Sequence, residues 1–251
     1  MNNRHTKILN IMSAKRKVTV NTLSEKLDVS QATIRQDLTL LENKGFLKRV
    51  HGGAVFNDTD DISHRMGVNY ERKLIIAKAA VEFVDEGETI FIESGSINAL
   101  FAKEVIRERK TTTIITSNAF IARQIGKEAE GRVILLGGIY QAESECLVGT
   151  LVRECLKILN FSKAFIGVDG FSETSGFTGR NMMRAEVNSE IIKRSPQTFI
   201  LTDSSKFGKI NLSKYCNTKD IDYLITDNNL PEKYYTIFKK SGVKIIIPEL
   251  E

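Results

Sequence analysis

From residue 72 onward, short apolar runs rich in β-branched residues alternate with longer amphipathic stretches. The runs predicted to be strands are Thr89–Ile92, Thr112–Thr116, Val133–Leu136, Ala164–Val168, Thr198–Leu201, Tyr223–Thr226 and Val243–Ile247. The stretches predicted to be helices are Lys73–Val84, Ala99–Arg109, Ala119–Lys127, Leu147–Leu159 and Arg184–Arg194. Strands that are apolar on both faces and alternate with helices form parallel sheets covered on both sides. The pattern therefore predicts an α/β domain with a mostly parallel sheet over residues 72–251.

The first 56 residues show helical periodicity instead, and they predict a small domain of their own. Thr19 is positioned to cap a short helix, and Asp28-Val29-Ser30 then makes a tight turn. A second helix is expected from Gln31 to Lys44, because Gly45 is the type of residue that follows a helix C-terminus. Two helices joined by so short a turn form a helix-turn-helix.

The second of these helices separates apolar and polar side chains onto different faces. Ile34, Leu38 and Leu41 point toward a core when successive residues are placed about 100° apart. The far side carries Ala32, Arg35, Gln36 and Thr39. A recognition helix presents such side chains to base edges in the major groove, where arginine bridges a guanine and glutamine an adenine.

The segment Phe46–Phe56 is predicted to be a hairpin wing with Gly52-Gly53 at its turn, and it brings two cations toward phosphates. The residues expected to contact DNA are Ser30, Gln31, Ala32, Thr33, Arg35, Gln36, Thr39, Lys48, Arg49 and His51. Taken alone, a polar helix face is also compatible with an ordinary solvated helix; the short turn, the wing and the charge distribution together favour DNA.

That charge distribution is strongly uneven. Residues 1–57 carry ten Lys or Arg and four Asp or Glu, a formal charge of +6, whereas the rest of the chain sums to −1. A polyanion partner confined to the first domain is the natural inference, and double-stranded DNA satisfies it. Residues 57–71 begin with acidic, polar Asn57–Asp61 and are expected to be the interdomain linker.

Other features limit the class of protein. No run of about 18 apolar residues is present, so no transmembrane segment or membrane partner is expected. The polar N-terminus does not resemble a signal peptide, and the chain is expected in the cytoplasm. The three cysteines, Cys146, Cys155 and Cys216, lack metal-ligand spacing, so neither a metal nor a cofactor is expected.

Polar loops follow several of the predicted strands. Backbone N–H groups in Glu93–Asn98, at the start of a helix, are suited to an anion such as phosphate. Thr116-Ser117-Asn118 repeats this arrangement, and Gly137-Gly138 permits close backbone approach. In open α/β sheets, ligands bind beyond the carboxyl ends of the strands, where such loops converge. Each loop by itself is equally compatible with an ordinary turn or helix cap.

Later loops add charged candidates. Lys206 is suited to pairing with phosphate and Asp169 to accepting sugar hydroxyls, while Arg180 faces either the anion or solvent. The residues expected to contact an effector are Ser94, Gly95, Ser96, Asn98, Thr116, Ser117, Asn118, Gly137, Gly138, Asp169, Gly170, Arg180 and Lys206.

The N-terminal motifs together resemble the signature of the DeoR family of bacterial regulators. The matching segments are Ile8-Leu9, Val18-Thr19-Val20, Leu23, Val29–Leu38, Leu41-Glu42 and His51-Gly52-Gly53-Ala54. Gln36 stands where the family usually has a second Arg, which implies an altered operator preference. The resemblance assigns residues 1–56 to a winged helix-turn-helix.

The resemblance extends to the second domain, whose family fold is similar to ribose-5-phosphate isomerase. Asp203-Ser204-Ser205-Lys206 matches the family pattern without departure. The family's phosphate loop, Asp-x-Gly-Thr-Thr, corresponds here to Glu93, Gly95, Ser96 and Ile97, which implies a different ligand or weaker phosphate binding.

The resemblance implies a transcriptional regulator, a repressor whose operator affinity is modulated by a sugar phosphate, working as a homodimer or homotetramer. An effector-independent global DNA binder is one alternative. A sugar-phosphate isomerase using Lys206 and Asp169 is another, but the sequence shows no paired catalytic carboxylates beside that lysine. No catalytic residue and no enzymatic activity are therefore expected.

Overall fold

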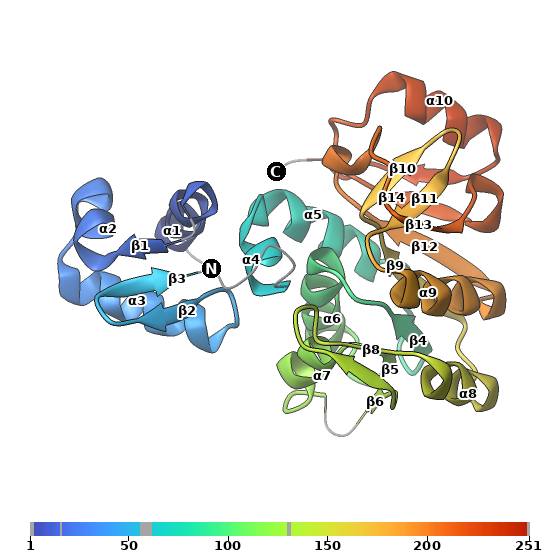
Figure 1. Cartoon of the computed structure of the whole chain (residues 1–251), viewed down its shortest axis with the longest axis horizontal. Helices are drawn as coiled ribbons and strands as arrows, with labels where there is room; N and C mark the ends of the chain where they lie inside the picture. Colours follow the sequence, from blue (N-terminus) through green and yellow to red (C-terminus); the bar gives the residue numbers. More distant parts are fainter. Residues whose placement is uncertain (1–2, 16, 56–61, 130–131, 250–251) are drawn as a thin grey trace. The chain divides into compact units, whose positions relative to one another are not determined.

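The computed structural model describes residues 3–15, 17–55, 62–129 and 132–249, which fall into two compact units (Figure 1). The N-terminal unit is Met1–Glu71 and the C-terminal unit is Arg72–Glu251. Of the linker expected over residues 57–71, residues 57–61 lie outside the described ranges. Its remainder forms helix α4 (Ile62–Gly67) and the first residues of α5 (Tyr70–Val81). Ile62 and Met66 of α4 are buried, which explains why the segment after Asp61 is ordered as a helix.

The N-terminal unit combines helices with a small antiparallel sheet. Its elements are α1 (Asn3–Ala14), β1 (Lys17–Thr19), α2 (Val20–Leu27), α3 (Gln31–Asn43), β2 (Lys48–Val50), β3 (Gly53–Val55) and α4. Among the described residues the strands lie in the order β1-β3-β2. The expected wing is therefore present as the β2–β3 hairpin, and β1 adds a strand that the sequence did not predict. Because Val50 pairs with Gly53, the turn is at His51-Gly52, one residue earlier than expected.

The C-terminal unit is built around one large sheet, which we call the main sheet. Within the described residues it has seven strands: β4 (Thr89–Ile92), β5 (Thr113–Thr116), β6 (Val133–Leu135), β9 (Lys163–Gly167), β12 (Gln197–Leu201), β14 (Tyr223–Ile225) and β15 (Lys244–Ile246). Every pairing between them is parallel. These are the strands that the apolar runs predicted, so the α/β fold class is confirmed.

Both faces of the main sheet are covered, as the apolar runs require. On one face, Phe165 and Phe199 stack on each other. Phe101 of α6 packs against Phe165, and Phe83, which follows α5, packs against Phe199. The alternate residues of the same strands join a second cluster with α8, α9 and α10. Its members include Phe91, Ala164, Ile166, Ile200, Leu224, Val152, Leu156, Val187, Ile191 and Phe238. Burial on both faces explains why these strands read as continuous apolar runs.

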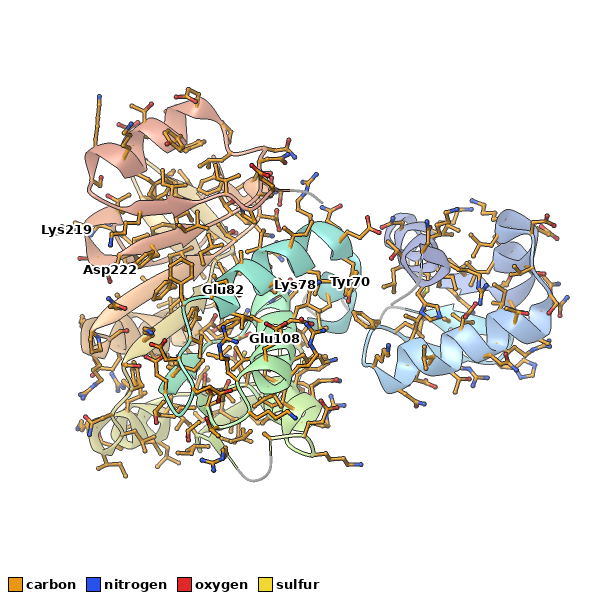
Figure 2. The ribbon with its side chains drawn as sticks, turned by 180° about the vertical axis from the view of Figure 1, so that it is seen from behind. Tyr70, Lys78, Glu82, Glu108, Lys219 and Asp222 are labelled. Atoms are coloured by element: carbon orange, nitrogen blue, oxygen red, sulfur yellow. The ribbon has the colours of Figure 1, made fainter. Side chains whose placement is uncertain are left out.

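Five described helices of this unit correspond to the predicted amphipathic stretches: α5, α6 (Ser96–Glu108), α7 (Ala119–Ile125), α8 (Thr150–Ile158) and α9 (Met182–Arg194). The helix α10 (Glu232–Lys240) was not predicted. Figure 2 shows Lys78 on α5 and Glu82 just beyond its end, and both side chains are exposed. Ile76, Ala77 and Ala80 of α5 are fully buried, so α5 is an ordinary amphipathic covering helix. No helix among the described residues is long and apolar enough to cross a membrane.

Two smaller sheets were not predicted. One contains β10 (Gly170–Ser172), β11 (Gly176–Gly179) and β13 (Ser213–Cys216), and the other is the hairpin of β7 (Ile139–Gln141) and β8 (Cys146–Val148). The helix expected over Leu147–Leu159 is wrong at its start, because Leu147 and Val148 belong to β8. Gly149, with φ +91°, separates that strand from α8.

The order of the strands creates a switch point in the main sheet. The order is β15-β14-β12-β9-β4-β5-β6. From β4 the chain adds β5 and β6 on one side, then returns and adds β9, β12, β14 and β15 on the other. The carboxyl ends of β4 and β9 therefore lie side by side at the place where the order reverses, which is the usual ligand position in open α/β sheets.

Candidate nucleic-acid interface and ligand site

The helix-turn-helix is closed by caps at both sides of its turn. Ser30 accepts a hydrogen bond from the Thr33 backbone N–H at 3.1 Å and starts α3. Asp28 takes a left-handed conformation, φ 52°, and its N–H donates to the Ser24 carbonyl to end α2. The Ser24 hydroxyl also donates to the Val29 carbonyl at 2.5 Å. The turn is thus held by its own side chains, as the sequence predicts.

The predicted DNA-contacting residues share one exposed surface of this unit. Most are exposed: Ser30, Gln31, Ala32, Arg35, Gln36, Lys48, Arg49 and His51. Thr33 and Thr39 are half-buried. On α3 the apolar residues Ile34, Leu38 and Leu41 are at most 1% exposed, so the polar face points away from the core. Arg35 donates to the Gln31 side chain at 3.1 Å, which orders the guanidinium along the helix.

The wing is tied to the helix through Thr39. The Thr39 hydroxyl donates to the Arg35 carbonyl at 2.8 Å and accepts from Arg49 Nη1 at 2.6 Å. The Arg49 backbone N–H donates to the Glu42 carboxylate at 2.7 Å. Thr39 was expected to face DNA, yet both hydrogen bonds of its hydroxyl are made within the protein. Its contribution is to fix the angle between the wing and α3.

Asp37 is a buried charge on α3, and the sequence did not single it out. Arg4 of α1 donates to it twice, through Nε at 2.6 Å and Nη2 at 3.1 Å, and His5 Nε2 lies 2.9 Å from Oδ1. Burial would raise the pKa of Asp37, but the hydrogen bonds and charges of Arg4 and His5 outweigh it and lower the pKa. The network fixes α3 against α1, so the polar face of α3 has a defined direction.

In the C-terminal unit the candidate ligand site consists of what we call the switch-point loops: residues 93–98 after β4, 167–170 after β9 and 202–206 after β12. Because β12, β9 and β4 are neighbours in the sheet, the loops lie at one edge. Gly95 has φ +145° and precedes α6, a backbone conformation that L side chains rarely adopt. No side chain of the described residues caps the start of α6, and the first N–H groups of a helix are the groups that bind anions.

Asn98 joins the first two of these loops. Its side-chain Nδ2 donates to the Glu93 carbonyl at 2.9 Å and to the Phe165 carbonyl at 3.1 Å. The residue is fully buried, and its Oδ1 has no hydrogen-bond partner among the described residues. Asn98 was predicted as an effector contact. In the structure its Nδ2 holds β4 and β9 together, and its Oδ1 has no hydrogen-bond partner within the described part of the chain.

Glu93 and Tyr215 both form hydrogen bonds with the backbone of Gly167. The Gly167 N–H donates to Glu93 Oε2 at 3.1 Å, and the Tyr215 hydroxyl donates to the Gly167 carbonyl at 3.1 Å. Burial raises the pKa of Glu93 to about 8, although the Gly167 N–H, Arg184 and Asn188 favour its ionised form. Burial also raises the pKa of Tyr215, with the charges of Asp169 and Glu93 adding to the effect. At neutral pH Glu93 is therefore largely a neutral acid.

The third loop carries a cation and a buried acid. Burial would raise the pKa of Asp203, but the Ser205 hydrogen bond and the charges of Lys73 and Lys206 lower it. Lys73 of α5 is only 6% exposed, and Lys206 is half-buried. Asp227, at the end of β14, accepts from the Ser204 N–H at 2.7 Å. Lys206 is therefore the cation that this loop contributes at the edge of the sheet, and Asp203 and Asp227 lie close by as acids.

Asp169 and its neighbours complete the edge. Asp169 Oδ2 accepts from the Arg180 backbone N–H at 3.1 Å, which joins the end of β9 to the start of α9. The Arg180 side chain is exposed. A Cβ on Gly170 would lie 2.5 Å from the Lys209 carbonyl, so this glycine is required by packing. Of the predicted residues, the structure brings together Ser94, Gly95, Ser96, Asn98, Asp169, Gly170, Arg180 and Lys206.

On the other side of β4, residues 116–118 after β5 and residues 137–138 after β6 make contacts within the protein. Asn118 donates to the Ser144 carbonyl at 2.9 Å, and its Oδ1 caps α7 by accepting from the Ile121 N–H at 2.9 Å. Thr116 Oγ1 accepts from the Asn118 N–H, and the Ser117 carbonyl accepts from Leu147. These contacts attach the β7–β8 hairpin to α7. An effector contact by Thr116-Ser117-Asn118 stays a prediction.

The glycines after β6 also serve the hairpin. A Cβ on Gly138 would approach the Val148 carbonyl and Val152 Cγ2 to 2.7 Å, so only glycine fits where β7 crosses α8. Gly137 is exposed with nothing near it. The absence of a side chain at Gly138 is explained by packing of the hairpin on α8, and the predicted approach of these glycines to a phosphate stays a prediction.

Several polar residues of the site were missed by sequence reasoning. They are Lys73, Arg184, Asn188 and Tyr215. Arg184 and Asn188 are one turn apart on α9, so their shared helix face was detectable as a polar stripe beside an apolar one. Tyr215 lies on β13, which was not predicted, and no local signal marks a buried lysine on α5.

Comparison with known proteins agrees with this geometry. The DeoR-like helix-turn-helix domain matches residues 4–60, and the DeoR C terminal sensor domain matches residues 68–228. The chain belongs to the DeoR family. This DeoR-family protein is therefore a DNA-binding transcriptional regulator whose second unit is a sensor domain.

Individual relatives point the same way. The chain is 33% identical to the HTH-type transcriptional regulator GolR of Listeria innocua, covering 98% of each chain. It is 33% identical to the lactose phosphotransferase system repressor of Staphylococcus epidermidis, covering 95% of this chain and 96% of that one. These relatives are regulators, and this chain is likewise a regulator and not an enzyme. A ribose 5-phosphate isomerase from Methanocaldococcus jannaschii is similar over 55% of each chain, with 23% identity and a TM-score of 0.42.

Proposed function

We propose that this regulator is a repressor that binds its operator through α3 and the wing and releases it when a phosphorylated sugar binds at the switch-point loops. The observation that carries the proposal is the meeting of three loops at the carboxyl ends of β4, β9 and β12. One loop offers the N–H groups at the start of α6, and another offers the charge of Lys206. An anionic metabolite fits that combination better than a neutral one.

The proposed DNA contacts divide by chemistry. Arg35 and Gln36 read base edges from the exposed face of α3, whereas Lys48 and His51 in the wing approach phosphates. Ser30, Gln31, Ala32 and Thr33 form the start of α3, where backbone N–H groups face a phosphate. Thr39 and Arg49 act by holding the wing in place.

The proposed effector contacts are divided in the same way. Ser94, Gly95 and Ser96 hold the phosphate, with Lys206 supplying charge. Asn98 Oδ1 and Asp169 accept hydrogen bonds from hydroxyl groups of the sugar. Asn98 Oδ1 lacks a partner among the described residues. A sugar phosphate supplies both kinds of group in one molecule. The repressor role and the sugar class are supported by relatives such as the lactose phosphotransferase system repressor.

We further propose that the protein works as a homodimer or a homotetramer in the cytoplasm. Helix-turn-helix proteins read two half-sites one helical turn apart with two copies of the recognition helix. Ligand control then acts on the arrangement of the copies, because a ligand shifts an equilibrium only by binding one state better than the other.

Fluorescence anisotropy with a labelled promoter fragment tests the proposal. A panel of phosphorylated sugars and their unphosphorylated counterparts is titrated into the preformed complex. The expected result is that at least one phosphorylated sugar weakens DNA binding, typically by about 5–150-fold, while its unphosphorylated form has little effect. DNA affinity that is independent of the whole panel contradicts the proposal and favours an effector-free global DNA binder.

Lys206→Ala and Lys209→Ala form a matched pair for the same assay. The two lysines lie in one segment, and Lys209 is exposed. Loss of Lys206 should raise the effector concentration needed for release by roughly tenfold or more, because a charge-assisted hydrogen bond contributes about 1.5–3 kcal/mol. Lys209→Ala should behave as wild type. Equal effects of the two substitutions contradict a specific phosphate contact.

A further inference from the structure

The β7–β8 hairpin and α8 expose large apolar side chains next to one another. On α8, Leu151 is 64% and Ile158 is 81% exposed. On β7, Ile139 is 60% exposed and lies next to the residue before α8, whereas Tyr140 projects from the opposite face of the hairpin. We call Leu151, Ile158 and Ile139 the α8 patch. At roughly 200 Å² of accessible surface for each large side chain, they expose on the order of 400 Å² together.

The elements that carry the α8 patch touch one another. The Cβ position of Gly149, the residue before α8, lies 3.3 Å from Ile139 Cδ1 and 3.7 Å from Met183 Cε. Gln141 of β7 donates to the Asn181 side chain at the start of α9, at 3.3 Å. The hairpin, the start of α8 and the start of α9 are therefore in direct contact. A patch of this size is comparable with the largest apolar patch on a typical monomer, about 300–600 Å², which is often functional.

The α8 helix is apolar over more of its circumference than the sheet covers. Val152 and Leu156 are fully buried against the core. Leu151, Cys155 and Ile158 are spaced i, i+4 and i+7, which aligns them in a second stripe about 100° from the buried one. Arg153 and Lys157 lie on the far side of the helix from this stripe. A helix apolar on two adjacent stripes is expected to pack against two partners, and the fold supplies one.

We propose that the partner is a second copy of this chain, with the two α8 helices packed antiparallel about a two-fold axis. The stripe is self-complementary in that arrangement, because Leu151 of one copy meets Ile158 of the other at both ends and Cys155 lies near the axis. A two-fold interface uses the same patch on both copies. An interface of standard size buries about 800 Å² per partner, and the α8 patch supplies about half of that as apolar surface. The inference rests on the proposed function, in which paired copies read two half-sites.

Light scattering coupled to gel filtration of the full-length protein, with two charge variants, tests this pairing. Leu151→Glu combined with Ile158→Glu sets like charges across the axis, and should raise the dissociation constant of the pair at least about 100-fold and halve the mass of the oligomer. Leu151→Glu combined with Ile158→Lys sets opposite charges at the same places. It should restore the mass, with a dissociation constant within about tenfold of wild type.

The two variants differ in one side chain at exposed positions, so circular dichroism should show both folded. Ile210→Glu with Leu212→Glu is the control, because these side chains are 61% and 74% exposed elsewhere in the chain, and it should leave the mass unchanged. Mild oxidation should cross-link wild type through Cys155 but not Cys155→Ser. Of the three cysteines, all within the described residues, Cys146 and Cys216 are buried.

Three results would overturn the pairing: a monomeric wild type at micromolar concentration, an unchanged mass for the like-charge variant, or a folded opposite-charge variant that stays dissociated. The proposed function is tested separately. If no phosphorylated sugar changes DNA affinity while the masses follow the expected pattern, the effector proposal fails and the interface stands.

Discussion

The polar groups of the two units are arranged in opposite ways. In the N-terminal unit the proposed base-reading side chains, Arg35 and Gln36, project from an exposed helix face. In the C-terminal unit the polar groups of the switch-point loops are mostly buried and bonded to one another, as Asn98 and Glu93 show. A long, rigid polyanion is met by projecting groups, whereas a small ligand needs donors that are already fixed in place.

This difference separates what substitutions should do. Removing a projecting side chain should weaken DNA binding and leave folding intact. Removing a group from the switch-point loops should leave its partners buried without hydrogen bonds, and that costs stability before any ligand is considered. The tyrosines allow the second effect to be followed by fluorescence, because the chain has no Trp and five of its six Tyr lie in residues 72–251.

Asn98→Ala should have the largest effect. It removes the side-chain donor of the Glu93 carbonyl and one of the two donors of the Phe165 carbonyl, which keeps the Glu93 N–H, and a buried unpaired group costs about 1–3 kcal/mol. The free energy of unfolding of the C-terminal unit should fall by about 3 kcal/mol in urea denaturation followed by tyrosine fluorescence. Asn228→Ala, at an exposed site, should change it little. A loss below about 1 kcal/mol would show that the loops are not interdependent.

Glu93→Gln should alter how stability depends on pH. The folded pKa of about 8 lies above the unfolded value of 4.5, so between these pH values the folded protein holds a proton that the unfolded chain has lost. Wild-type stability should therefore fall as pH rises through this window. The variant lacks that loss, so its stability relative to wild type should rise by about 1–3 kcal/mol from pH 5 to pH 8.

Urea denaturation at pH 5, 6.5 and 8 measures this difference. Glu143→Gln, at an exposed site, is the control and should run parallel to wild type. Parallel profiles for Glu93→Gln and wild type would mean that Glu93 is ionised in the folded protein, and the contrast between a buried neutral acid and exposed cations would disappear.

Arg35→Ala should weaken operator binding by about 1–3 kcal/mol and relax sequence preference, because a bidentate contact to guanine is lost. Its unfolding should stay within about 0.5 kcal/mol of wild type, as expected for an exposed position. Anisotropy with operator and random fragments measures the affinity. Equal losses on both fragments would make Arg35 a phosphate contact.

Thr39→Val should have the smallest effect. It removes the hydroxyl that joins Arg49 of the wing to α3, and the expected loss of operator affinity is about 0.5–1 kcal/mol. Thr39→Ser keeps the hydroxyl and should bind as wild type does. If Thr39→Ser and Thr39→Val are weakened equally, the methyl group and not the hydroxyl is what matters.

The same contrast explains what the sequence could predict. Every strand of the main sheet was predicted to within one residue at each end, because burial on both faces produces an apolar run that needs no context. The β7–β8 hairpin was missed, because its strands have three residues each and Leu147-Val148 continues the helical pattern of α8. Helix caps such as Ser30 were predicted because their chemistry is local.

The candidate ligand site was predicted only where the loop after a strand contains a glycine or a charged residue. Gly95 and Lys206 follow strands directly, so their common edge could be inferred from the parallel topology. Lys73 could not be predicted, because its burial depends on where α5 packs and not on its neighbours in sequence. The capping role of Asn118 was not predicted for a related reason: a polar residue after a strand serves equally well as a ligand contact or as a helix cap.

The buried carboxylate of Asp37 has a consequence for how such a regulator acquires new targets. Arg4 and His5 fix the rotation of α3 through Asp37, independently of the residues on either side of it. Arg35 and Gln36 can therefore be exchanged while the direction in which they project is retained. Retargeting the protein to a different operator therefore requires new side chains at the exposed positions of α3 and no redesign of the fold beneath them.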